Sequence, residues 1–273
     1  MRDKFYFIAV NYNGYEYSKQ YIESIQKLEL TENSEVKIII VDNKSNKDEL
    51  NILESYCEKL SNVYLIKNHI NLGYFGGLNE GIKKVVPTKN TIVIIGNNDL
   101  TFEKDFLLNL KLTEYDEDVL VLAPNIITRD GVHQNPHIVK SYSRLNKIKN
   151  KIYYSSYYIG KSFHFIYNNI KKIFVSDLPV KEHNHKMYIR TGIGACYILT
   201  KNFFNHFEKL DDSVFMWGEE AVFANQIESV NGKMLYDNTL IVKHYESASV
   251  KKIQSKERYK INQKSYKIYK KYL

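Results

Sequence analysis

The chain contains few of the residues that build cross-linked or membrane-spanning proteins. Among its 273 residues are two cysteines, four prolines and one tryptophan. The pair Cys57 and Cys196 is too small for a disulfide framework, and zinc-binding patterns of paired cysteines or histidines are absent. No apolar run approaches the roughly 20 residues that span a bilayer, and no signal-peptide cleavage site follows the short apolar stretch after Lys4. The sequence therefore predicts a cytoplasmic protein.

The basic residues are concentrated in two segments. The net charge is +8, whereas contents of 44% hydrophobic and 26% charged residues are ordinary for a globular protein. Residues 140–186 hold ten lysines or arginines against two acidic residues, among clustered tyrosines and phenylalanines, and residues 251–273 hold nine against Glu257 alone. Such stretches suggest docking to an anionic membrane surface or to nucleic acid. A solvated basic face and a homo-oligomer interface are the alternatives.

The first 125 residues alternate between strand and helix patterns. Short β-branched runs separated by helical periodicity are typical of βαβ units and a mostly parallel sheet, an architecture found in nucleotide-binding proteins. The predicted strands cover residues 5–10, 36–41, 63–66, 91–95 and 119–123, and the predicted helices cover 17–28, 47–60, 76–85 and 102–112.

The alternation stops after Pro124. The basic segment favours an amphipathic helix, and Gly232 suits the end of a helix over 219–230. The remaining expectations are irregular structure or short strands over 126–139, regular structure over 187–199, a helix from about 203, and short strands over 233–236 and 240–243.

The most informative segment is the apolar run that starts at Thr91 and ends in Asn97-Asn98-Asp99. In an open α/β sheet, ligands bind at the carboxyl ends of the strands. A carboxylate there suits a Mg²⁺ or Mn²⁺ ion that a substrate diphosphate also binds. A polar turn after a core strand is the alternative, since turns favour Asn and Asp.

Three earlier strands also end in polar or glycine-rich motifs. These motifs are Val10-Asn11-Tyr12-Asn13-Gly14, Val41-Asp42-Asn43-Lys44-Ser45, and the run from Asn68 to Gly81 that contains Asn-Leu-Gly-Tyr-Phe-Gly-Gly. A Rossmann dinucleotide site fits less well, because Gly-x-Gly-x-x-Gly does not follow the first strand. The order and spacing of the four motifs resemble inverting glycosyltransferase family 2, closest to its bacterial rhamnosyltransferase-like members.

The resemblance covers about residues 5–125 and 187–249 and implies a GT-A fold. We therefore expect an α/β, Rossmann-like αβα sandwich with a mixed, mostly parallel central sheet. One catalytic domain over 1–250 would comprise a nucleotide-sugar half, 1–125, and an acceptor half, 126–250. The basic-aromatic insertion, about 140–186, and the basic C-terminal tail, 251–273, fall outside the resemblance.

The resemblance also implies residues that bind the donor. It implies that Val10 and Tyr12 hold the nucleotide base. It also implies that the Asp42 carboxylate accepts a hydrogen bond from the ring N–H of uracil or thymine. Glycines allow close approach of the backbone to a ligand, and the helix start that follows favours an anion. The further donor-binding residues implied are Asn71, Gly73, Gly76, Asn79, Asn98 and Asp99.

A metal site is implied by two residues. Asp99 occupies the last position of the family's Asp-x-Asp-like motif, in which Asn97 replaces the first Asp. With one carboxylate in that motif, Mg²⁺ or Mn²⁺ needs other ligands, and His244 resembles the family's late histidine that completes metal or diphosphate binding. A structural role for His244 is the alternative.

The base and the acceptor site are implied by the stretch Asp211 to Phe223. Its match places the general base on Glu220, beside Glu219. The choice between the two stays open, and stabilisation of a helix start is the alternative role for the pair. Trp217 is expected to pack against a sugar or in the core. Gly194 and Ala195 resemble the segment that lines the acceptor side.

The resulting hypothesis is a metal-dependent, inverting sugar transfer from a UDP- or dTDP-linked donor. The acceptor would be a hydroxyl of a growing, lipid-linked bacterial surface glycan such as capsule or O-antigen, reached from the inner face of the membrane. A non-catalytic sugar-nucleotide or polysaccharide-binding protein on a degenerate GT-A fold is the main alternative. Nucleic acid is not expected as a partner, because no DNA- or RNA-binding motif accompanies the basic segments.

Overall fold

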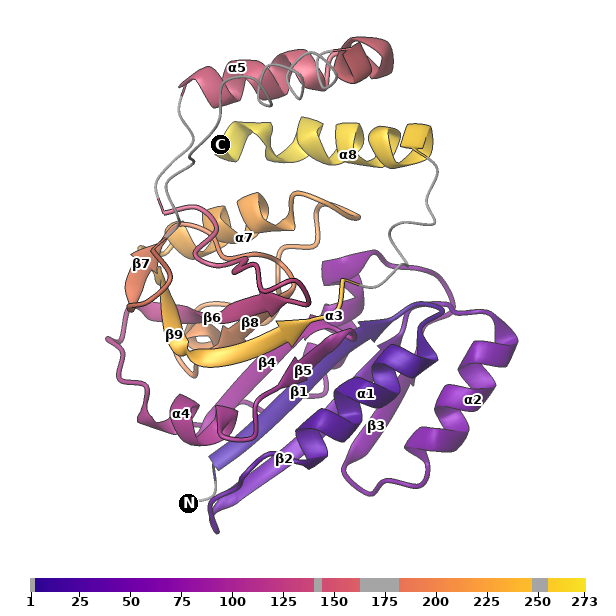
Figure 1. Ribbon diagram of the computed structural model, residues 1–273, viewed down its shortest axis with the longest axis vertical. Helices are drawn as coiled ribbons and strands as arrows, with labels where there is room; N and C mark the ends of the chain where they lie inside the picture. The colour runs from indigo at the N-terminus through magenta and orange to yellow at the C-terminus, as the bar shows by residue number, and fades with distance from the viewer. Residues whose placement is uncertain (1–2, 140–143, 163–181, 247–254) are drawn as a thin grey trace.

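A computed structural model of the protein describes residues 3–139, 144–162, 182–246 and 255–273 (Figure 1). Within these residues, nine strands form one sheet in the order β3-β2-β1-β4-β8-β6-β9-β5, with β7 paired to β9. The strands are β1 Asp3–Asn11, β2 Ser34–Asp42, β3 Val63–Lys67, β4 Thr91–Asn97, β5 Leu100–Phe102, β6 Val119–Thr128, β7 Met187–Ile189, β8 Cys196–Leu199 and β9 Lys233–His244.

The first half of the sheet is parallel, as the sequence predicts. Strand β1 lies between β2 and β4, and β3 extends the sheet beyond β2, with all three pairings parallel. The chain reverses its direction of progress across the sheet at β1, so the carboxyl ends of β1, β2 and β4 meet at a topological switch point. The connecting helices are α1 Tyr15–Gln26, α2 Lys47–Cys57 and α3 Tyr74–Ile82.

The second half of the sheet is mixed. Strand β8 is antiparallel to both β4 and β6, whereas β6 and β9 are parallel. The prediction of two short strands over 233–236 and 240–243 was wrong, because β9 is a single strand whose pairing with β6 shifts register between Pro124 and Asn125. The mixed αβα architecture expected from the motifs is confirmed.

Three helix predictions need correction. The helix expected over 102–112 is α4, Phe106–Leu112, because residues 100–102 pair with β9 as the short strand β5. The helix expected from 203 is only a 3-10 turn, Phe203–Asn205, whose aromatic side chains pack together. The helix α7, Glu219–Glu228, ends before Asn231, and Asn231 rather than Gly232 adopts the left-handed conformation (φ 56°).

Alternate residues of the buried strands pack on opposite faces of the sheet. On β1, Phe5 and Phe7 face the cluster that includes α1 and α4, and Tyr6 and Ile8 face the cluster that includes α3 and α7. Both faces are therefore covered by helices, which explains why these strands read as continuous apolar runs. The sheet is fixed from both sides, and its carboxyl edge is a rigid base for a site.

The C-terminal segment packs onto the second half of the fold. Helix α8, Ser255–Tyr269, is followed by a 3-10 turn, Lys270–Tyr272, and lies between α7 and α5, Arg144–Tyr153 (Figure 1). The helix predicted in the basic segment is thus present over part of it, and the aromatic residues between 163 and 181 lie outside the described residues. In the part of the chain that the structure describes, no helix is long and apolar enough to cross a membrane.

Candidate functional site

The ends of β1, β2 and β4 are joined by a buried network of polar side chains. The Asn11 amide donates to Asp42 Oδ1 (2.9 Å) and to Ser45 Oγ (3.1 Å), and its oxygen accepts from Asn98 Nδ2 (3.0 Å). Asp42 also accepts from the Ser45 backbone N–H (3.0 Å). Asn98 further donates to Ser18 Oγ (2.8 Å). These bonds fix three strand ends relative to one another. The side chains of Asp42 and Asn98 are therefore engaged in hydrogen bonds within the protein.

Asn43 organises the loop between β3 and α3. Its amide nitrogen donates to Asn71 Oδ1 (2.9 Å) and to the Gly73 carbonyl (2.8 Å), while its oxygen accepts from Asn68 Nδ2 (3.1 Å) and the Leu72 N–H (3.0 Å). The side chain of Asn43 is buried. The loop that carries Asn71 and Gly73 is therefore attached to the end of β2 by the protein's own contacts.

Gly73 joins this loop to the segment that precedes α7. It has φ +78°, and a Cβ at this position would lie 2.2 Å from the Phe215 carbonyl oxygen. The N–H of Tyr74 donates to the same carbonyl (3.0 Å). Only glycine allows this approach in this conformation. Gly76 is buried in the first turn of α3, where an added Cβ would lie 3.1 Å from Leu72 Cβ.

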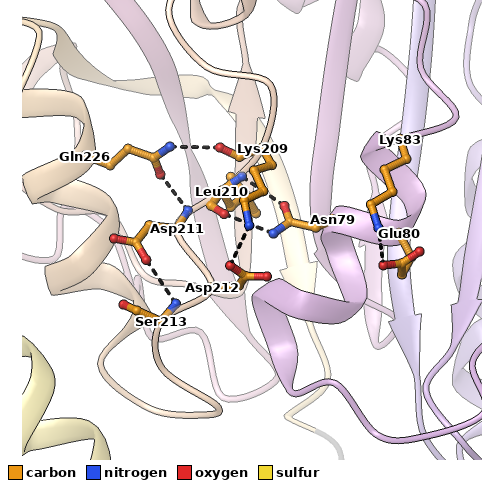
Figure 2. A network of polar contacts seen from close by, with 9 residues as sticks. All are labelled: Asn79, Glu80, Lys83, Lys209, Leu210, Asp211, Asp212, Ser213 and Gln226. Carbon is orange, nitrogen blue, oxygen red and sulfur yellow. Dashed lines mark hydrogen bonds and ion pairs between the residues drawn. The ribbon is translucent and has the colours of Figure 1, made fainter.

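Asn79 connects α3 to the same distant segment, as Figure 2 shows. Its amide donates to the Leu210 carbonyl (3.0 Å) and accepts from the Leu210 N–H (2.9 Å). Gln226 of α7 holds the neighbouring backbone, accepting from the Asp211 N–H (2.9 Å) and donating to the Lys209 carbonyl (2.8 Å). Both polar groups of Asn79 are thus engaged in a structural contact within the protein, and its contact with a donor stays a prediction.

Asp99 and His244, 145 positions apart in the sequence, lie together at the sheet edge. His244 Nε2 is 3.3 Å from Asp99 Oδ1, and both side chains are buried. The antiparallel pairing of β5 with β9 places Leu100 opposite His244 and so brings the two residues together. The two residues that the motifs suggest as metal ligands are therefore neighbours in space.

Gln134 sets the orientation of the His244 ring. His244 Nδ1 is 2.8 Å from Gln134 Oε1, and Gln134 Nε2 donates to Glu246 Oε1 (3.1 Å). Because an amide oxygen only accepts, Nδ1 carries the hydrogen, and the lone pair of a neutral ring lies on Nε2. That nitrogen lies 3.3 Å from Asp99 Oδ1 and 3.4 Å from Asn97 Nδ2, so the Asn97 amide can donate to it, and the two acceptor atoms of Asp99 and His244 stand side by side.

The donor set fits a divalent cation. A carboxylate oxygen and an imidazole nitrogen with a second hydrogen-bond partner are common metal ligands. Among the described residues, no group of three or more His, Cys, Asp or Glu side chains could hold a metal by itself. Asp99 and His244 would therefore bind the ion together with oxygens from a ligand or water.

The Gly194-Ala195 segment links the metal pair to the two glutamates. The N–H of Asn97 donates to the Ala195 carbonyl (2.9 Å), and the N–H of Gly194 donates to Glu220 Oε1 (3.2 Å). Tyr74 completes the connection, since its hydroxyl donates to the Gly194 carbonyl (2.7 Å). Glu220 is therefore held next to the carboxyl end of β4, on the side predicted to receive the acceptor.

The two glutamates at the start of α7 have different environments. Glu219 is only 5% exposed, whereas Glu220 is half-buried. Burial raises the pKa of Glu219 to about 8, with the nearby Glu220 carboxylate as the second cause, against backbone N–H groups of Glu219 and Trp217 that lower it. At neutral pH, Glu219 is therefore mostly protonated and is a poor proton acceptor.

A left-handed turn precedes the two glutamates. Trp217 has φ +64° and Gly218 φ +100°, and α7 begins immediately after them. A tryptophan in this conformation is uncommon and persists only where the surroundings fix it. The ring of Trp217 is half-buried under the Arg258 guanidinium, 5.4 Å from the ring centroid.

The predicted base-binding residues lie at the end of β1. Tyr12 is 48% exposed, so its ring is accessible to a ligand. The Val10 side chain instead packs on α3, since a Cβ on Gly77 would lie 3.0 Å from Val10 Cγ2. Val10 is partly buried and its backbone lies between β2 and β4, opposite Val41 and Asn97, so its contact with a nucleotide stays a prediction.

Sequence reasoning missed Gln134, Tyr74 and Asn43. Gln134 lies in a stretch without periodicity, so no pattern marked it as the partner of His244. Tyr74 and Asn43 stand inside the strand-end motifs, and their position beside Gly73 and Asp42 was the available signal.

The sequence matches the model of one protein family. Residues 6–174 match the model of glycosyl transferase family 2. The low-salt glycan biosynthesis hexosyltransferase Agl10 of Haloferax volcanii is 24% identical over 232 residues, which cover 85% of this chain and 64% of that protein.

Solved structures share the fold at low sequence identity. The crystal structure of GalNAc-T7 with UDP, GalNAc and Mn²⁺ has a TM-score of 0.63 at 15% identity, covering 97% of this chain and 48% of that one. The mannosyltransferase PcManGT from Pyrobaculum calidifontis, in complex with GDP-Man and Mn²⁺, has a TM-score of 0.56 at 13% identity, covering 91% and 59%. The chain thus spans less than two thirds of the length of these relatives, and the likeness confirms the expected GT-A type of fold.

Proposed function

Because the chain belongs to glycosyl transferase family 2, we propose that it transfers a sugar from a nucleoside-diphosphate sugar to a hydroxyl of a growing glycan. The contact between Asp99 and His244 carries the proposal, because two residues suited to bind a metal lie side by side at the edge where the strand ends meet. Solved relatives of this fold were crystallised with Mn²⁺ and with UDP or GDP-Man. The rhamnosyltransferase-like branch and a UDP- or dTDP-linked donor remain predictions.

On the donor side, Asp99 Oδ1 and His244 Nε2 would hold Mg²⁺ or Mn²⁺, which when bound supplies positive charge for the leaving diphosphate. Gln134 keeps the ring nitrogen directed at that position. Tyr12, whose ring is exposed, is the proposed contact of the nucleotide base, together with Val10 at the end of β1. At the start of α3, the Gly73 N–H donates to Asn71 Oδ1 and the Tyr74 N–H donates to the Phe215 carbonyl, so the helix dipole rather than these two N–H groups would favour an anion there.

On the acceptor side, Glu220 is the proposed general base. An inverting transfer needs a carboxylate that takes the proton of the acceptor hydroxyl while its oxygen attacks the anomeric carbon. Glu220 is accessible and held by the Gly194 N–H, whereas the buried Glu219 retains its proton near neutral pH. Glu219 therefore supports the site, and the proton goes to Glu220.

A thermal-shift screen tests the donor class. Binding to the native state raises its apparent stability, so UDP or dTDP with Mn²⁺ should raise the melting temperature of the wild-type chain, and Asp99→Asn should abolish the metal-dependent part of the shift. A rise in melting temperature with GDP but not with UDP or dTDP would contradict the pyrimidine preference predicted for Asp42. Nucleotide binding without donor hydrolysis or transfer would favour the alternative, a non-catalytic sugar-nucleotide-binding protein.

We also propose that the acceptor is lipid-linked and that α5 docks to an anionic membrane surface. Leu145, Ile148 and Ile152 are 70%, 54% and 41% exposed and lie on one face of α5 by their spacing. Exposed lysines alternate with them, and residues 144–162 contain no acidic residue. An apolar stripe with basic flanks is typical of helices that lie in a membrane interface. The same charge pattern disfavours pairing of this face with a second copy.

Liposome flotation at low salt tests the docking surface. Binding to vesicles that contain anionic lipid should be lost in Ile148→Asp. Leu112→Asp is the matched control, because Leu112 is an exposed apolar residue of another helix, α4. Equal binding of both variants, or binding to neutral vesicles alone, would contradict the proposal, and a dimer that Ile148→Asp dissociates would assign the face to an oligomer interface instead.

A further inference from the structure

Helix α8 lies directly against the left-handed turn that precedes the proposed base. Ser265 Oγ donates to the Met216 carbonyl (2.8 Å), and Ser265 is buried. A Cβ on Gly218 would lie 2.3 Å from the Tyr269 ring, so the ring packs on the glycine backbone. Arg258 stacks over Trp217. Three residues from three turns of one helix thus contact three consecutive residues of the turn.

The turn needs such support because of its own conformation. Trp217 and Gly218 both have positive φ, and a residue with a side chain seldom adopts that region unless its surroundings fix it. A backbone N–H of Trp217 also bonds to the Glu219 carboxylate and lowers its pKa against the effect of burial. A change in this turn therefore changes the environment of the two glutamates that follow it.

Helix α8 is itself anchored away from the turn. The Arg190 guanidinium donates to the Tyr272 carbonyl (2.7 Å) and pairs with Glu228 of α7 (2.8 Å). Tyr266 stacks on Tyr154 with ring centroids 4.4 Å apart. Tyr266 and Leu273 also pack with Ala221 in a small apolar cluster. These contacts fix the position of α8 against α7 and α5. Helix α8 can therefore restrain the conformation of the turn.

We propose that α8 is a positioning element for the catalytic step, in which Ser265, Tyr269 and Arg258 hold the turn Met216–Gly218 so that Glu220 meets the acceptor. The assignment to catalysis rests on the proposed function, whereas the mechanical link between α8 and the turn does not. A basic C-terminal segment that serves only to dock or to stabilise the fold would not set the geometry of this turn.

Trp217 provides a direct readout, because it is the only tryptophan of the chain. Its emission and its quenching by acrylamide report the turn in the full-length protein without any substrate. Ser265→Ala removes the bond to Met216, and Tyr269→Ala removes the ring under Gly218. Tyr269→Phe keeps the ring and is the conservative rescue, and Lys264→Ala is the matched control because Lys264 is exposed on the same helix.

We expect Ser265→Ala and Tyr269→Ala to shift the emission of Trp217 and to increase its quenching, while Lys264→Ala and Tyr269→Phe match the wild type. In transfer assays the first two should lose about ten- to a hundredfold in kcat with KM for the donor unchanged, the loss expected for a misplaced reacting group. If Tyr269→Ala does not fold, Ser265→Ala and Arg258→Gln carry the same test.

Unchanged Trp217 fluorescence in the folded variants would overturn the link between α8 and the turn. Changed fluorescence with unchanged kcat would overturn the positioning role. A wild-type chain that transfers no sugar, with the fluorescence differences present, would contradict the proposed function and leave the link supported.

Discussion

The strand side of the candidate site and its helix side differ in how their residues are held. On the strand side, Asn11, Asp42 and Asn98 come from three adjacent strand ends and are joined through the Asn11 side chain, and the left-handed residues there, Asn13 and Lys44, lie in the loops that follow β1 and β2. On the helix side, Trp217 and Gly218 are left-handed, Glu219 is buried with a raised pKa, and the contacts come from α3 and α8. From this difference we expect the proposed donor side of the site to form with the sheet, whereas the proposed base, Glu220, also depends on the contacts of α8.

The sharpest test of this difference is Glu220→Gln. The variant keeps the shape of the side chain but cannot accept a proton, so we expect about a thousandfold loss of kcat, within the usual range for general bases. Single-turnover transfer measures it under conditions where chemistry limits the rate. Glu219→Gln is the matched control and should retain most activity, because glutamine resembles the protonated Glu219. The opposite order of the two variants would move the base to Glu219.

On the strand side, Asp99→Asn removes the negative charge but keeps the volume of the side chain. We expect about a hundredfold loss of Mn²⁺-dependent activity, as when one electrostatic contact to a developing charge is removed. Activity at a series of Mn²⁺ concentrations measures the effect. Full activity with an unchanged metal requirement would remove Asp99 from the metal site.

A smaller effect is expected at Gln134. Gln134→Ala leaves His244 in place but removes the acceptor that orients its ring, and loss of such a partner typically weakens metal binding about ten- to a hundredfold. Mn²⁺ titration with the nucleotide present gives the affinity. An unchanged affinity would show that the ring is oriented by other contacts.

Much of the strand side could be predicted, because its residues lie at the ends of strands with a strong apolar pattern. The pairing of Asp99 with His244 followed from the order of the family motifs, although the strand β5 that brings them together is too short to show any periodicity. The contact of Asn79 with Leu210 joins residues 131 positions apart, and nothing local to Asn79 distinguishes it from a ligand-binding amide. The many basic residues of α8 suggested a solvent-exposed or membrane-facing segment, so the burial of Ser265 and Tyr266 could not be predicted.

That long-range contact gives a test of the connection between the two sides. Asn79→Ala leaves the buried N–H and carbonyl of Leu210 without their amide partner, so we expect a loss of about 1–3 kcal/mol in the free energy of unfolding. Denaturant unfolding measures it. Glu80→Ala, one position away and paired with the exposed Lys83, should change stability by much less. Equal losses would show that the Asn79 contact contributes nothing specific.

The last prediction concerns the pH dependence of stability that Glu219 contributes. Its pKa is raised in the folded state to about 8 from an ordinary value of 4.5. The stabilisation by the bound proton is therefore complete below about pH 4.5 and is lost as the pH rises through 8. Between about pH 6 and pH 9 the melting temperature of the wild type should fall more than that of Glu219→Gln. Parallel curves for the two proteins would contradict the raised pKa.

We propose that one site combines two functions: Asp99 and His244 bind the metal and the donor, and Glu220 takes the proton of the acceptor. A Mn²⁺ binding isotherm in the presence of UDP or dTDP, recorded for the wild type, Asp99→Asn and Glu220→Gln, separates the two roles. We predict wild-type affinity for Glu220→Gln and a strong loss for Asp99→Asn. Equal affinity in all three proteins, or a loss confined to Glu220→Gln, would contradict this division.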